Sequence, residues 1–68
     1  MTTLALIYRF MELPTVAKID IATNLGLATV EDYKRQKKGF ATWLLLEAKA
    51  KGKLELVWEK VVAYEPTL

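Results

Sequence analysis

The sequence lacks both cysteine and histidine, and these two absences exclude several kinds of chemistry. Without cysteine, the chain can form neither a disulfide nor a thiolate metal site. Without histidine, it has no imidazole to serve as a general base near neutral pH or as a neutral metal ligand. Nucleophilic triads depend on such a base. The sequence therefore predicts a protein that is not an enzyme and holds no metal.

Several segment types are also missing. The apolar runs are far shorter than the ~20 residues that a membrane-spanning helix needs. The N-terminus has no basic stretch before an apolar core and no small-residue cleavage site after it, as a signal peptide would. The three glycines are scattered and form no phosphate-binding loop. We expect a cytoplasmic protein without a cofactor or a small-molecule substrate.

What the sequence does contain is a high share of apolar residues in a short chain. Its 68 residues allow one domain, spanning 1–68, and 53% of them are hydrophobic. So small a domain cannot bury all of these side chains. The exposed ones could be scattered singly or could form a patch that binds a partner. Composition leaves both alternatives open.

Apolar spacing predicts an all-α fold, a compact bundle of about five short helices. Pro14, Gly26, Gly52 and Pro66 stand where helices should end. Thr29 should cap the third helix, which is polar and short. The predicted helices span 3–12, 15–25, 29–39, 40–51 and 54–65.

The same spacing predicts which side chains form the core. We expect Trp43 and Trp58 to belong to it, whereas Leu56 and Val62 fall off the apolar side of the last helix. The residues expected on the buried sides of the first two helices are Leu4, Ile7 and Met11, with Leu6, Phe10 and Leu13 close by, and then Val16, Ile19, Ala22 and Leu25, with Ala17 and Ile21 beside them.

Charge is segregated along the sequence. Between residues 34 and 53 there are seven Lys or Arg residues and one acid, Glu47, while most acids lie outside that stretch. Three interpretations remain open: a solvated face, contact with a nucleic-acid backbone, or self-association in which a basic patch meets an acidic one.

Several motifs resemble the effector-associated domains of bacterial conflict systems. They are Leu25-Gly26-Leu27, Phe40-x-x-Trp43-Leu44-Leu45-x-Glu47-Ala48, Gly52-Lys53-Leu54 and the segment 57–66. Such domains are similar to the death fold, although this chain is shorter than a full six-helix death fold. The resemblance implies homotypic adaptor binding that recruits or clusters an effector in bacterial defence or signalling.

We therefore expect an adaptor domain that binds like helical domains, on itself or on an effector protein. The charge pattern predicts two contact surfaces, one formed by Lys34, Arg35, Lys37 and Lys38 and the other by Glu55 and Glu59.

The alternative is a small nucleic-acid-binding regulator that uses the basic cluster 34–38. In a helix-turn-helix arrangement, however, Glu31 and Asp32 would begin the recognition helix and repel DNA. A third option is a helical bundle that belongs to a larger complex with an unrelated partner.

Overall fold

Residues 2–64, which the computed structural model describes, form five α-helices and no strand. This confirms the all-α prediction. The helices are α1 (Thr3–Met11), α2 (Thr15–Asn24), α3 (Val30–Gln36), α4 (Phe40–Ala50) and α5 (Leu54–Tyr64), and the 3₁₀ turn η1 (Lys37–Gly39) joins α3 to α4. The predicted stop at Pro66 lies outside the described residues.

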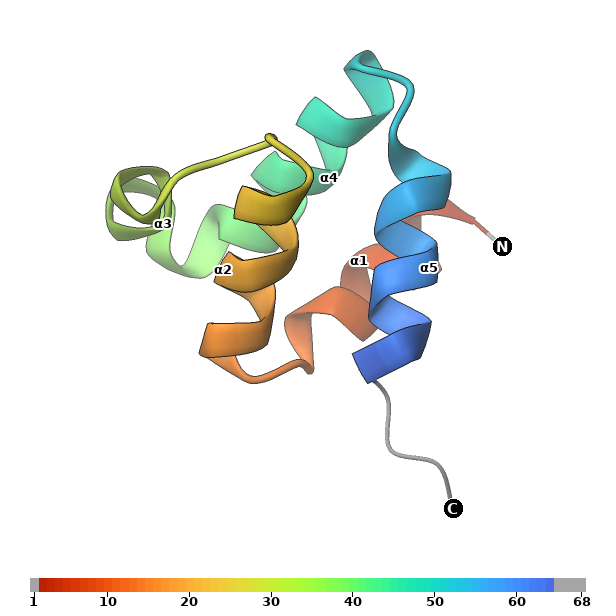
Figure 1. Cartoon of the computed structure of the whole chain (residues 1–68), viewed down its shortest axis with the longest axis horizontal. Coiled ribbons are helices and arrows are strands. Elements are labelled where there is room, and N and C mark those ends of the chain that lie inside the picture. Colours follow the sequence, from red (N-terminus) through yellow and green to blue (C-terminus); the bar gives the residue numbers. More distant parts are fainter. Residues whose placement is uncertain (1, 65–68) are drawn as a thin grey trace.

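The helices pack so that α3 and α5 lie on opposite sides of the bundle, with α2 and α4 between them (Figure 1). Helix α1 packs against α4 and α5, whereas α3 packs against α2 and α4. The η1 turn is therefore held on the side of the molecule that faces away from α5.

Two glycines end helices in the same way. Gly26 and Gly52 have φ angles of 68° and 70°, a left-handed conformation that glycine adopts without a Cβ penalty. After α2, the Leu27 N–H donates to the Ala22 carbonyl at 2.9 Å, and after α4 the Lys53 N–H donates to the Ala48 carbonyl at 2.8 Å. Both are Schellman motifs, which satisfy carbonyls that a helix end would leave unpaired.

The Lys53 side chain joins these two helix ends. Its Nζ donates to the Leu25 carbonyl at 2.7 Å, in a partly buried contact between the turn after α4 and the end of α2. A charged donor makes such a bond stronger than a neutral one. The turn that leads into α5 is thereby tied to α2.

The core contains fifteen buried hydrophobic side chains among the described residues. Phe40, at the start of α4, is central to it. Its ring centroid lies 6.3 Å from that of Phe10, 5.1 Å from Tyr33 and 6.1 Å from Trp43. Aromatic pairs at these separations add to the stabilisation from area burial. Phe40 thus connects α1, α3 and α4.

The predicted buried sides of α1 and α2 were partly wrong. In α1, Leu6 and Phe10 are buried, whereas Leu4 and Met11 are exposed. Both sides of this helix are apolar, so periodicity alone cannot choose between them. The side that carries Phe10 is buried because the Phe10 ring packs on Phe40.

In α2, Val16 is 79% exposed, while the buried residues are Ala17, Ile21 and Ala22.

Trp43 and Trp58 were both expected in the core. They pack against it but are only partly buried. The guanidinium of Arg9 lies 4.7 Å from the ring centre of Trp58, so this cation covers the outer face of the indole. Leu56 and Val62 are exposed, as the sequence predicts.

The helix ends generate a matched test. Gly26→Ala forces a Cβ into a left-handed conformation, where it would meet only Lys53 Nζ at 4.0 Å, so strain and not collision should set the cost. We expect a loss of about 1–2 kcal/mol in the free energy of unfolding, measured by urea denaturation. Gly39→Ala is the control, because Gly39 has a φ of −85° and open space around it. That change should leave stability unchanged or raise it by about 0.4–1 kcal/mol. Equal stabilities for the two variants would contradict this account of the turn.

Candidate protein-interaction surfaces

The segment that carries the basic cluster begins with a capping box. The Asp32 N–H donates to Thr29 Oγ1 at 3.3 Å, and the Thr29 N–H donates to Asp32 Oδ2 at 2.9 Å. The bond from the Thr29 backbone, assisted by the Thr29 hydroxyl and the Arg35 charge, holds the pKa of the Asp32 carboxyl below its ordinary value of 3.8, although partial desolvation opposes this shift. The start of α3 is therefore well defined.

Lys34 and Arg35, two of the predicted contact residues, are paired within their own helix. Lys34 Nζ lies 3.9 Å from Glu31 Oε1, and Arg35 forms an ion pair with Asp32. Both side chains remain mostly exposed, so water screens each pair. These two cations are partly compensated by neighbouring carboxylates and contribute less to a positive surface than the sequence suggested.

Lys37 and Lys38, on η1, differ from Lys34 and Arg35 in their ion pairing. Both are exposed, and neither forms an ion pair with another residue in the range 2–64. Lys37 has a φ of 48° and is the only residue other than glycine with a positive φ in this range. The backbone of a residue that has a Cβ is strained in that conformation. The two lysines form the uncompensated part of the predicted basic surface.

These two lysines border a groove of about 410 Å³. Its lining residues come from α1, α2, α3, η1 and the start of α4: Met11, Lys18, Tyr33, Lys37, Lys38, Phe40 and Ala41. None of them is acidic. We refer to these seven residues as the basic groove.

Lys18 is the residue of this groove that sequence reasoning missed. It lies on α2, far along the chain from the cluster at 34–38, and reaches the groove because the turn at Pro14 folds α2 back beside the end of α1. Its Nζ donates to the Met11 carbonyl at 3.4 Å, a long hydrogen bond. No local sequence signal marks this lysine, since only the packing of α2 brings it near Lys37 and Lys38.

The predicted acidic surface lies on α5. Glu55 and Glu59 are one helical turn apart and exposed, and within the described part of the chain neither forms an ion pair. Glu55 also borders a hollow of about 250 Å³ between α5 and the start of α1. We refer to Glu55 and Glu59 as the acidic face.

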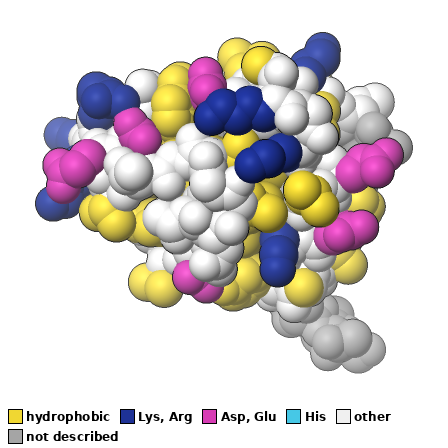
Figure 2. All heavy atoms as spheres, turned by 45° about the horizontal axis from the view of Figure 1, so that its top comes forward, with side chains coloured by type: hydrophobic (Ala, Val, Ile, Leu, Met, Phe, Trp, Pro, Cys, Tyr) yellow, Lys and Arg dark blue, Asp and Glu magenta, His cyan; other side chains and the backbone are white. Residues whose placement is uncertain are grey.

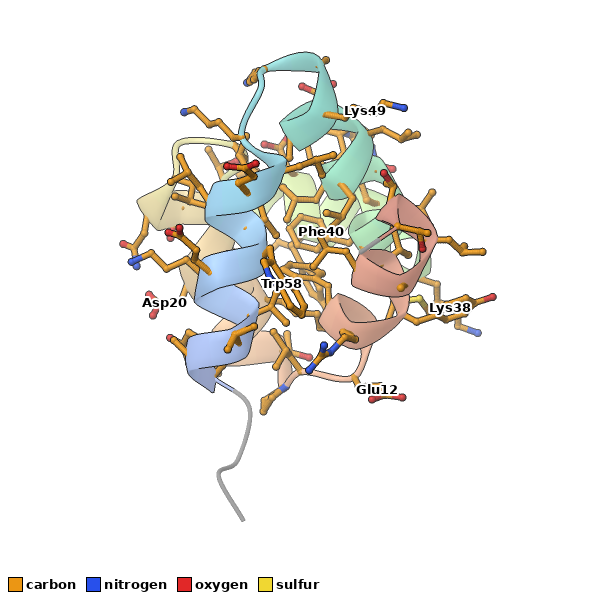
Figure 3. The ribbon with its side chains drawn as sticks, turned by 90° about the vertical axis from the view of Figure 1, so that its right-hand side faces the viewer. Glu12, Asp20, Lys38, Phe40, Lys49 and Trp58 are labelled. Carbon is orange, nitrogen blue, oxygen red and sulfur yellow. The ribbon has the colours of Figure 1, made fainter. Side chains whose placement is uncertain are left out.

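The basic groove and the acidic face lie on different sides of the molecule. Figure 3 shows Lys38 on the outer side of α1, away from α5, while Trp58 of α5 points inward towards α1. In Figure 2, basic side chains gather at the end that α3 occupies in Figure 1, mixed with acidic ones, and further acidic side chains lie at the opposite edge. The acidic face therefore cannot reach the basic groove of its own chain.

Exposed apolar side chains are found on several helices, but on α1 they form a row. Leu4, Tyr8 and Met11 are 60%, 59% and 46% exposed, and their spacing places them on one side of the helix. The row ends at Met11, which lines the basic groove. Of the two alternatives left open by composition, the structure thus favours a contiguous patch on this helix.

Across residues 2–64, no group of three acidic side chains is arranged to hold a metal ion. In the same range, no helix has the length and apolar character needed to cross a bilayer. The features that distinguish the surface are therefore the groove, the acidic face and the apolar row on α1.

The chain matches one family model, that of the GTPase-associated adaptor domain, over residues 3–63. No curated protein matches it, and no solved structure does. The adaptor character implied by the sequence resemblance is thereby confirmed, whereas the effector-associated and death-fold assignments stay predictions. An adaptor family implies protein partners. Because the match covers nearly the whole helical bundle, the chain belongs to the GTPase-associated adaptor domain family.

Proposed function

We propose that this adaptor domain binds like helical domains head to tail, through the lysines of one copy and the acidic face of another. It would act without catalysis in the cytoplasm, and would recruit or cluster an effector in bacterial defence or signalling. Lys37 and Lys38 provide the main basic contacts, with Lys34 and Arg35 at the edge. Glu55 and Glu59 provide the acidic contacts.

The observation that carries this proposal is the separation of uncompensated charge on the folded domain. Lys37 and Lys38 lack ion-pair partners among residues 2–64, and so do Glu55 and Glu59. Complementary charged patches accelerate association and set its orientation. Since the two patches lie on different sides, a contact between them leaves one of each free and can propagate.

Single pairs of exposed charges contribute only about 0–1 kcal/mol each, so several must act together. The basic groove meets this requirement because its lysines converge on one site. Binding that depends on such pairs should also weaken as salt rises. The proposal therefore predicts weak, salt-sensitive association.

The strained backbone of Lys37 supports a role in binding. A non-glycine residue at a φ of 48° costs on the order of 1–3 kcal/mol, and glycine would avoid this cost. Gly39, two residues later, has an ordinary negative φ. The lysine at this strained position has an explanation if its positive charge binds a partner, because glycine carries no charge.

The nucleic-acid alternative receives less support from the geometry. Two of the five residues in the cluster 34–38, Lys34 and Arg35, pair with the carboxylates of Glu31 and Asp32. Those carboxylates lie in the first turn of α3, where a recognition helix would meet phosphates.

Self-association can be measured directly by light scattering over a range of concentration and salt. At low salt, the average mass should rise with concentration, and added salt should reverse the rise because it screens the ion pairs. Charge reversal at Lys37 and Lys38 together should weaken association at least about tenfold, which corresponds to about 1.4 kcal/mol. Lys49→Glu is a control, since Lys49 is exposed and lies at the far end of α4 from η1 (Figure 3).

Domains that stay monomeric at high concentration and low salt, and that bind no related domain, would exclude the proposed function. Tight, salt-dependent binding of a DNA or RNA duplex would favour the alternative.

Lys37 allows stability and binding to be separated. Lys37→Gly should raise the free energy of unfolding by about 1 kcal/mol because it relieves the positive φ, yet it should weaken association because the cation is lost. Lys37→Ala removes the same charge and keeps the Cβ, so it should weaken association equally without the gain in stability. Urea denaturation and light scattering of the two variants provide both readouts. Association of Lys37→Gly at wild-type strength would show that the strained lysine serves no binding role.

A further inference from the structure

We propose that the basic groove is the docking site for the α5 helix of a second copy, and that Lys18 and Met11 take part in this contact. The inference rests on the proposed function and specifies its site. It adds a third lysine and an apolar contact that the charge pattern of the sequence did not reveal.

Positive charge converges on the basic groove. Lys18 comes from α2, and Lys37 and Lys38 come from η1, so three cations from two separate elements surround one groove. Among the described residues, none that lines the groove is acidic. Like charges held together raise the local potential and favour an acidic ligand. Within residues 2–64, the Nζ of Lys18 makes only a long bond, to the Met11 carbonyl, and its other hydrogens can donate to a carboxylate.

The groove also has an apolar wall that is supported by the core. Tyr33 packs edge-on against Phe40 with ring centroids 5.1 Å apart, and Phe40 is itself buried in the core. Met11 is 46% exposed at the rim, and a flexible methionine adapts to different partner surfaces. An occupant should therefore present apolar surface beside its carboxylates.

The acidic face of α5 has this character. Val62 is 46% exposed and follows Glu59 by three residues, so Glu55, Glu59 and Val62 lie on one side of the helix. Such a row fits a helix-in-groove contact, in which the carboxylates meet the lysines and Val62 packs on Met11. Because Lys38 lies on the outer side of α1, away from α5 of the same chain, only a second copy can supply this helix (Figure 3).

Lys18→Glu provides the test, because the charge pattern of the sequence gives this residue no role. Sedimentation equilibrium at low salt should show a dissociation constant raised about tenfold or more for Lys18→Glu. Lys49→Glu makes the same change in net charge outside the groove and should stay within about twofold of wild type. Lys18→Met keeps most of the apolar stem, so it should fold even if the glutamate variant does not, and it should weaken binding about threefold. Far-UV circular dichroism of each variant verifies the fold.

Backbone amide NMR then maps the contact. On dilution of the wild-type protein, the signals of Met11, Lys18 and Tyr33 should shift together with those of Glu55, Glu59 and Val62, along one binding curve.

If folded Lys18 variants associate like wild type while reversal at Lys37 and Lys38 abolishes association, the groove assignment is wrong and the proposed function survives. If none of these changes affects association, both fail. If Glu55→Lys with Glu59→Lys has no effect while Lys18→Glu does, the occupant is another acidic segment and the α5 assignment is wrong.

Discussion

The burial of Phe40 is the constraint on which the rest of the structure depends. Its ring touches those of Phe10, Tyr33 and Trp43, and it lies directly after η1. Burying a side chain of this size contributes about 1.5–3 kcal/mol, a large share for a domain so small. Helix α3 has no buried residue of its own, so the Tyr33–Phe40 contact is its main aromatic link to the bundle. The positions of Lys37 and Lys38 thus follow from the core.

A 68-residue chain without disulfides must obtain its stability from packing and from well-formed helix ends. The two Schellman motifs provide this at Gly26 and Gly52, and Lys53 ties their ends together. The side chains proposed to bind contribute little to the core: the lysines of η1, Lys18, and the glutamates of α5.

Much of the fold could be predicted from residue spacing and from individual stop signals. Gly26 and Gly52 mark helix ends because only glycine adopts a left-handed conformation cheaply, and Thr29 marks a helix start because its hydroxyl caps free amides. The buried side of α1 could not be predicted, since both Leu4 and Leu6 fit a helical apolar pattern and only the position of Phe40 decides between them. The charge pattern predicted Lys37, Lys38, Glu55 and Glu59 as contact residues. It missed the pairing of Lys34 and Arg35, although their i,i+3 spacing from Glu31 and Asp32 permits such pairs on a helix. It also missed the approach of Lys18, which depends on three-dimensional packing.

The central claim is that two different surfaces of one domain bind each other between copies. Two variants test it most directly: one with Lys37 and Lys38 changed to alanine, which keeps its acidic face, and one with Glu55 and Glu59 changed to alanine, which keeps a basic groove. Sedimentation velocity of an equimolar mixture should show a one-to-one dimer that does not grow, because only one intact contact can form, while each variant alone stays monomeric. A mixture that remains monomeric under conditions where the wild-type protein associates would contradict head-to-tail binding through these surfaces.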